Sequence, residues 1–163
     1  MGFRERCMPD LSVETVYDMD LHQLAESGIK GFIFDIDNTL VTYDDAVAGE
    51  ELTLWLKQLA QMGFSVALVS NNSRARVERF AESIGLPFYA RALKPCKRYL
   101  KKACRALEIP PEKIALVGDQ VFTDILGGNR MNMFTVLVSP ISDKDTKFVK
   151  WKRKWERRIM KSD

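Results

Sequence analysis

The sequence has little histidine and cysteine and no long hydrophobic run. Among 163 residues there is one histidine, His22, and there are three cysteines, Cys7, Cys96 and Cys104. These cysteines lack the spacing of metal ligands, and their odd number argues against a disulfide framework and for a reducing compartment. The apolar runs stay under ten residues, whereas a transmembrane helix needs roughly 20. These scarcities exclude a zinc-finger module, a disulfide-stapled domain and a membrane-spanning helix.

The N-terminal segment has no recognisable targeting signal. Its first ten residues, MGFRERCMPD, carry charges where a secretory signal peptide has its apolar segment. Arg6 lies where a myristoylation signal requires Ser or Thr. With 46% hydrophobic and 29% charged residues, the chain is expected to form a packed core. The sequence therefore predicts one domain over residues 1–163, cytoplasmic by default, with an organellar location left open.

Apolar runs alternate with helical patterns along the chain. Strands are expected at 30–36, 64–70, 88–90, 113–119 and 134–139. Helices are expected at 50–63, 73–85 and 95–109, the last with Pro95 in its first turn, and a short helix leads to Gly127-Gly128. Near-continuous apolar strands separated by helices indicate a parallel sheet covered on both faces. We therefore predict a doubly wound α/β domain with a core at about 28–140 and a basic C-terminal helix at about 145–161.

Polar side chains follow the expected strands where those strands end. They are Asp35 and Asp37; Ser70, Asn71 and Asn72; Lys94; and Asp119. Because the carboxyl ends of parallel strands meet at one edge of the sheet, we expect these side chains to converge there. A carboxylate pair is costly to bury unless something compensates its charge. The pair at Asp35 and Asp37 therefore predicts a metal ion or a reaction that needs both acids.

Each of these groups also has a structural explanation when it is taken alone. Aspartates commonly cap helices and form turns, and Ser70 fits a cap of the helix at 73–85. A lysine before proline is most often solvated, and Asp119 fits the start of a helix. The order DxDxT, Ser, Lys-Pro and GDxxxxD is what favours phosphate chemistry over these separate explanations.

The segments FDIDNTLV, LVSNN, LKP and GDQVFTD resemble the four motifs of the haloacid dehalogenase superfamily of phosphohydrolases, over about residues 30–140. More narrowly, the sequence is similar to the YqeG-like subclass IIIA phosphatases, which are related to phosphatidylglycerophosphate phosphatases. MPDLSVETVYD, GGNR and WERRI also fit this narrower group. The resemblance implies a Rossmann-like fold and a Mg²⁺-dependent phosphatase of phosphate monoesters.

The resemblance also implies roles for individual residues. Asp35 is the expected nucleophile that forms an aspartyl phosphate, and Asp37 the general acid and then the general base. Thr39 is expected to orient the loop around Asp37. Phosphate binding is expected from Ser70, Asn71 and Lys94. Mg²⁺ ligands are expected from Asp35, the backbone carbonyl of Asp37, Asp119 and, as a ligand or a partner of the ligands, Asp124.

The chain is too short between its motifs to hold a cap domain. Only eight residues separate Val41 from Glu50, and the 23 residues between Ser70 and Lys94 are taken up by one helix and a short strand. The predicted domain is therefore capless, with an open site. Such a site needs a bulky substrate, a surface that presents the substrate, or a neighbouring subunit, so a homo-oligomer stays open.

The basic character of the chain is concentrated at its C-terminus. Residues 144–163 carry a net charge of +6 and the other 143 residues carry −3. Residues 147–161 fit a helix with one aromatic and apolar stripe, formed by Phe148, Trp151, Trp155 and Ile159. Its cations lie elsewhere around the helix: Lys150, Arg153, Lys154, Arg157 and Arg158. The stripe suits a helix resting on an anionic membrane surface, or one that packs on the sheet. A specific nucleic-acid contact is not expected, because the rest of the chain is slightly acidic.

The sequence leaves three candidate functions open. The first is a Mg²⁺-dependent phosphomonoesterase acting on phosphatidylglycerol phosphate, at the inner face of a membrane. The second has the same catalytic residues but a soluble phosphometabolite or nucleotide as substrate. The third is a non-catalytic module that binds RNA or protein, against which the intact pair Asp35 and Asp37 argues.

Overall fold

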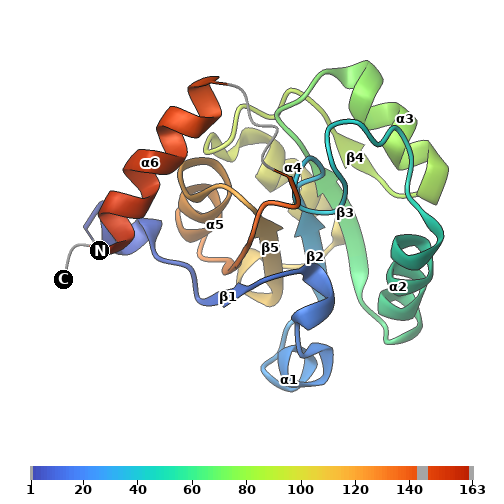
Figure 1. Ribbon diagram of the computed structural model, residues 1–163. Coiled ribbons are helices and arrows are strands. Elements are labelled where there is room, and N and C mark those ends of the chain that lie inside the picture. Colours follow the sequence, from blue (N-terminus) through green and yellow to red (C-terminus); the bar gives the residue numbers. More distant parts are fainter. Residues whose placement is uncertain (1, 143–146, 162–163) are drawn as a thin grey trace.

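The computed structural model describes residues 2–142 and 147–161, with only the backbone of Phe148. Its centre is a six-stranded parallel sheet with the order β1-β6-β5-β2-β3-β4. The strands are β1 (Leu11–Val13), β2 (Gly31–Phe34), β3 (Ser65–Val69), β4 (Phe88–Tyr89), β5 (Ile114–Gly118) and β6 (Phe134–Val138). The α-helices are α1 (Leu21–Glu26), α2 (Glu50–Gln61), α3 (Arg74–Ile84), α4 (Lys97–Leu107), α5 (Leu126–Asn129) and α6 (Lys147–Lys161). Helices lie on both sides of the sheet (Figure 1), so the predicted fold class is confirmed.

Two hydrophobic clusters cover the two faces of the sheet. Phe32 and Phe34 of β2 pack with α2 and α3, whereas Ile33, between them in sequence, packs with α4. Successive side chains of a strand point to opposite faces, so a fully apolar strand such as β2 contributes side chains to both clusters. This double burial is why the central strands read as continuous apolar runs.

The register of the central strands places the predicted site residues at one edge. Phe34 of β2 is level with Leu68 of β3 and with Val117 of β5. Asp35, immediately after β2, donates its backbone N–H to the carbonyl of Val117 at 2.9 Å. The residues that follow these three strands therefore emerge together at the carboxyl end of the sheet.

The edge strand β1 was not predicted. It has only three residues and is half-buried, so neither its length nor its pattern separates it from a loop. It pairs with β6, and Asp10 accepts hydrogen bonds from the backbone N–H and the hydroxyl of Thr135, at 2.8 and 3.0 Å. Such a strand is specified by a distant partner and cannot be recognised locally.

Two local predictions were wrong in position. Pro95 precedes α4 instead of lying in its first turn, because a turn closed by Cys96 N–H and the carbonyl of Leu93 (2.8 Å) comes before the helix. Gly127 and Gly128 lie within α5 instead of after a helix. A Cβ on Gly128 would meet Cγ2 of Thr135 at 2.5 Å, so glycine is needed there for close contact with β6.

The basic C-terminal segment forms α6, which lies beside α5 in Figure 1. Residues 145 and 146, where this helix was expected to begin, lie outside the described residues. Across the described part of the chain, no helix combines the length and apolar character that crossing a membrane requires. No inserted domain covers the carboxyl end of the sheet within residues 2–142 and 147–161, in agreement with the capless prediction.

Candidate active site

A cluster of three buried carboxylates lies at the carboxyl end of the sheet. Asp35 follows β2, Asp119 follows β5, and Asp124 belongs to a π-helical turn, Val121–Ile125. One carboxylate oxygen from each lies within 4.8 Å of the others. A Cβ on Gly118 would lie 2.2 Å from Cγ of Asp124, so only glycine leaves room for this carboxylate.

Lys94 joins two members of this cluster. Its Nζ donates to Oδ1 of Asp35 at 2.9 Å and to Oδ1 of Asp124 at 2.6 Å, and the residue is only 5% exposed. The side chain of Asn71 holds the backbone of Lys94: it accepts from its N–H at 2.7 Å and donates to its carbonyl at 3.2 Å. In this structure Asn71 thus orients Lys94, and its expected role in phosphate binding stays a prediction.

Burial dominates the electrostatics of the cluster. It raises the pKa of Asp35 well above its usual value, with Lys94 opposing the rise and Asp124 adding to it. Burial together with the charge of Asp124 raises the pKa of Asp119 to about 6. For Lys94, burial favours a lower pKa, but the charges of Asp124 and Asp35 raise it above its usual range. The three carboxylates outnumber the two cations that contact them, Lys94 and Arg153 of α6, so an additional cation would stabilise the cluster.

The donor set fits a hard divalent cation. Mg²⁺ and related ions bind carboxylate oxygens, and the three clustered groups are all of this kind. The excess negative charge gives a physical reason for a cation here, which an exposed acidic patch would not supply. Asp35, Asp119 and Asp124 are the residues that would hold it.

Asp37 lies two residues beyond Asp35 and contacts α3. Its Oδ1 accepts from Nε and Nη2 of Arg76, at 3.2 and 2.9 Å, and its Oδ2 accepts from Nδ2 of Asn72 at 2.8 Å. Asp37 is buried, as the ion pair with Arg76 allows. The sequence analysis missed Arg76, because no local pattern distinguishes it from the other polar residues of α3. Asn72 was expected at this edge of the sheet as the last residue of LVSNN, but its contact with Asp37 was not predicted.

Thr39 and Ser70 lie close to the carboxylates. The hydroxyl of Thr39 donates to Oδ1 of Asp119 at 3.3 Å, so Thr39 contacts the cluster directly, beyond its expected effect on the loop. The hydroxyl of Ser70 accepts from the backbone N–H of Asn72 at 3.1 Å. Both side chains are buried at the end of the sheet.

A pocket of about 260 Å³ opens at this edge. It is lined by Asp35, Asp37, Tyr43, Ser70, Asn71, Asn72, Gln120, Thr123, Val149 and Lys152. Asp35 and Asp37 thus face one cavity although their hydrogen-bond partners differ. Lys94, Asp119 and Asp124 are buried around Asp35 and do not line the pocket.

The C-terminal helix α6 is part of the site. Nη1 of Arg153 donates to the carbonyl of Asp119 at 2.7 Å, and Nη2 forms an ion pair with the Asp119 carboxylate. Nζ of Lys152 donates to Oε1 of Gln120 at 3.1 Å, and Glu156 accepts from the backbone N–H of Phe122 at 3.0 Å. This polar docking was not predicted, because it uses a different face of the helix from the aromatic stripe.

The aromatic stripe of α6 does not pack on the sheet. Trp151 and Trp155 are 58% and 46% exposed, and their rings contact each other edge to face. The side chain of Phe148, the first member of the predicted stripe, lies outside the described residues. The alternative in which the stripe packs on the sheet is therefore wrong for both tryptophans.

These features define a class of protein. A parallel sheet whose central strand ends in an aspartate pair, with a lysine and two further aspartates from neighbouring loops, is the arrangement of haloacid dehalogenase-type phosphatases, which are phosphoric monoester hydrolases. The fold is also that of the cobalt-bound deoxy-D-mannose-octulosonate 8-phosphate phosphatase of Haemophilus influenzae. That likeness has a TM-score of 0.55 and 17% identity, and covers 82% of this chain and 88% of the other.

The chain belongs to the family described as Mitochondrial PGP phosphatase, whose model matches residues 1–142. It is 38% identical over 153 residues to "Probable phosphatase YqeG" of Bacillus subtilis, covering 94% of this chain and 89% of that protein. It is 26% identical over 155 residues to the chloroplastic/mitochondrial phosphatidylglycerophosphate phosphatase 1 of Arabidopsis thaliana, covering 90% of this chain. The match spans 44% of that longer plant protein. The chain is thus a YqeG-like phosphatase, and the non-catalytic alternative is not supported.

Proposed function

We propose that this phosphatase is Mg²⁺-dependent, works through an aspartyl phosphate on Asp35, and hydrolyses phosphatidylglycerol phosphate at a membrane surface. The observation that carries the mechanism is the shared cavity: Asp35 and Asp37 line one pocket, while Lys94 contacts Asp35 from the buried side. The substrate is supported by the family description and by the plant relative's name.

In the proposed reaction these side chains have the following roles. A carboxylate oxygen of Asp35 attacks phosphorus, the bond between phosphorus and the leaving oxygen breaks, and Asp37 gives that oxygen a proton. Water then attacks the phosphorus of the aspartyl phosphate, Asp37 takes the water's proton, and Asp35 is released as a carboxylate. The hydroxyl of Ser70 and the ammonium group of Lys94 stabilise charge on the phosphoryl oxygens. When bound to Asp35, Asp119 and Asp124, Mg²⁺ supplies positive charge that offsets repulsion between the carboxylate and the phosphate.

The outer face of α6 supports a membrane-bound substrate. Trp151 and Trp155 are exposed there, and Lys150, Lys154 and Arg158 are exposed on the same side of the helix. Tryptophans beside cations favour binding at the interface of an anionic bilayer. Val149 and Lys152 of the same helix line the active-site pocket, so a bilayer bound at α6 would lie next to the reacting groups. A peripheral, cytoplasmic location follows as part of this proposal.

A soluble phosphate monoester is the second candidate. The relative in Bacillus subtilis is named a phosphatase without a substrate, and the pocket residues that contact the phosphoryl group would be the same. An assembly of several copies stays a prediction, since one chain is described.

The test measures phosphate release from phosphatidylglycerol phosphate in vesicles, from an aryl phosphate, and from a panel of soluble sugar phosphates and nucleotides. We expect Mg²⁺-dependent release that a chelator abolishes and a preference for the lipid. Asp35→Asn should remove activity on every substrate, whereas Glu82→Gln, an exposed site on α3, should retain it. Full activity of Asp35→Asn would exclude the nucleophile, and faster turnover of a soluble phosphate would exclude the lipid assignment.

A further inference from the structure

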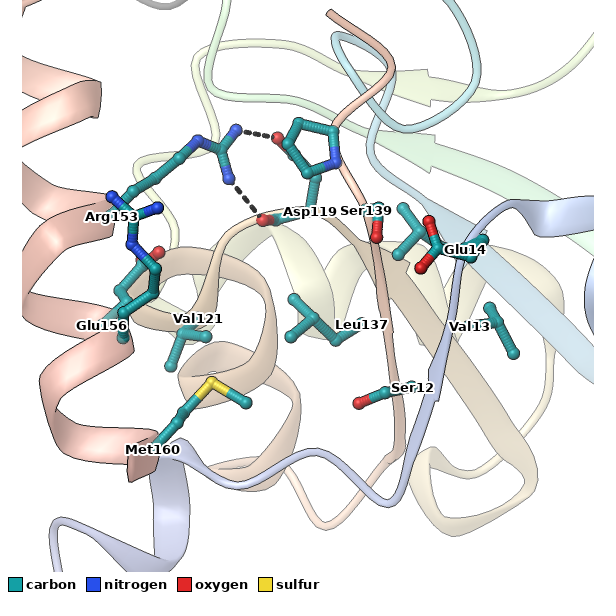
Figure 2. A pocket seen from close by; sticks show the side chains of 13 residues that line it. Ser12, Val13, Glu14, Asp119, Val121, Leu137, Ser139, Arg153, Glu156 and Met160 are labelled. Carbon is teal, nitrogen blue, oxygen red and sulfur yellow. Dashed lines mark hydrogen bonds and ion pairs between the residues drawn. The ribbon is translucent and has the colours of Figure 1, made fainter. Parts of the chain in front are cut away.

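The contact between Arg153 and Asp119 joins the C-terminal helix to the carboxylate cluster. Figure 2 shows the guanidinium of Arg153 reaching from α6 to the backbone and side chain of Asp119. The Asp119 side chain has no exposed surface, and that of Arg153 is 15% exposed. An ion pair this buried is screened little by solvent and has a defined geometry.

The two carboxylate oxygens of Asp119 contact different residues, which are far apart in the sequence. Oδ2 pairs with Arg153 of α6, and Oδ1 accepts from the hydroxyl of Thr39 at 3.3 Å. A carboxylate oxygen can accept more than one interaction, so Oδ1 keeps capacity for a cation while Oδ2 is held by the guanidinium. Arg153 and Thr39 together thus set the rotation of this carboxylate.

Neighbouring residues of α6 fix the segment that carries Asp119. Lys152 binds the side chain of Gln120, and Glu156 accepts from the backbone of Phe122. One turn of helix therefore contacts three positions in the four residues 119–122. Of these residues only Arg153 contacts a proposed metal ligand directly, and loss of such a partner lowers metal affinity by about 10–100-fold.

A second pocket lies on the other side of Arg153. It has a volume of about 420 Å³ between α6 and the strands β1 and β6, and Ser12, Leu137 and Met160 are among its lining residues (Figure 2). Asp119 and Arg153 both line it as well. Shortening Arg153 would open Asp119 to water from this pocket, in addition to removing its partner.

We propose that Arg153 is a positioning residue for Asp119, so that the C-terminal helix completes the divalent-cation site. This inference rests on the proposed function, because it concerns the same cation. Under this inference the cation site is incomplete without Arg153, a residue far from the four motifs. The helix α6 then acts on catalysis through its inner face as well as through the tryptophans of its outer face.

The test is Mg²⁺ binding to the full-length protein by calorimetry, without substrate, in wild type and four variants. Arg153→Met keeps most of the side-chain length and removes the charge, and we expect Mg²⁺ affinity to fall at least about 10-fold. Arg153→Lys should recover part of the loss, since a single ammonium group reaches Asp119 without the guanidinium fork. Arg157→Ala, an exposed arginine one turn later, should bind Mg²⁺ as wild type does.

The Glu156→Ala variant distinguishes the positioning of Asp119 from the docking of the helix. It removes a contact that holds α6 but leaves the contact between Arg153 and Asp119 in place. We expect it to change Mg²⁺ affinity less than Arg153→Met, with circular dichroism confirming that both variants are folded. Equal affinity in folded Arg153→Met and wild type would overturn the inference, and so would an equal loss in Glu156→Ala. Because Mg²⁺ binding is measured without substrate, failure to hydrolyse phosphatidylglycerol phosphate would count against the proposed substrate alone.

Discussion

Arg76 of α3 donates two hydrogen bonds to a single oxygen of Asp37, at 2.9 and 3.2 Å. The same guanidinium donates to the carbonyls of Thr42 and Asp45, so it links α3 to the loop that follows Asp37. Asp37, the proposed proton carrier, is therefore held by a residue outside the phosphatase motifs.

Replacing Arg76 should impair catalysis more than binding. Arg76→Lys cannot make the same set of contacts, so Asp37 would lose its fixed orientation. We expect kcat to fall by about 10–100-fold with KM nearly unchanged, because proton transfer contributes on the order of 10²–10⁴-fold to rate. Steady-state kinetics on an aryl phosphate measures the two constants separately. Arg79→Lys, an exposed arginine on α3, is the control, and a change in KM alone would contradict the role of Arg76.

The metal-free protein should lose stability as pH rises through about 6. The pKa of Asp119 is raised from 3.8 to about 6 by burial and by Asp124. A group with a raised pKa stabilises the folded state fully below the unfolded value, and this contribution is lost as pH increases through the folded value. Denaturant unfolding with a chelator should therefore show a decline between pH 4 and 7 that is weaker in Asp119→Asn, by on the order of 1–3 kcal/mol. Identical pH dependence in the two proteins would contradict the prediction.

Gly118→Ala should disable the site through packing. The added Cβ would lie 2.2 Å from Cγ of Asp124, and Asp124 would have to move away from Lys94. We expect activity to fall at least about 100-fold and the free energy of unfolding to fall by about 1–3 kcal/mol. Gly49→Ala is the control, because a Cβ there meets nothing within 4 Å. Normal activity in Gly118→Ala would show that Asp124 is not needed in this position.

The exposed tryptophans should carry membrane binding. Replacing both Trp151 and Trp155 by alanine should weaken binding to anionic vesicles at least about 10-fold, and raising the salt concentration should weaken wild-type binding. Leu54→Ala removes an apolar side chain of similar exposure (57%) on α2 and should leave binding unchanged. Vesicle sedimentation with and without anionic lipid measures these effects. Equal binding by the double variant and wild type would exclude α6 as the membrane contact.

Most of the fold and of the candidate site could be predicted from local patterns in the sequence. The apolar runs around β2, β3 and β5 predicted a parallel sheet, and its topology then predicted that Asp35, Ser70 and Asp119 would meet at one edge. The prediction succeeds because a central strand that is buried on both faces is apolar at nearly every position. The three-residue strand β1 has no such apolar pattern, because it forms mainly through its pairing with β6.

The order of residues along the chain specifies which residue types reach the carboxyl edge of the sheet, because strand register converts chain order into position. The cations that pair with these carboxylates depend on tertiary packing: Arg76 contacts Asp37 from 39 residues away in the sequence, and Arg153 contacts Asp119 from 34. Tertiary packing also explains why α6 docks by its polar face and leaves Trp151 and Trp155 exposed. A helical stripe shows which residues share a face, but which face packs depends on the groups that the rest of the fold presents to it.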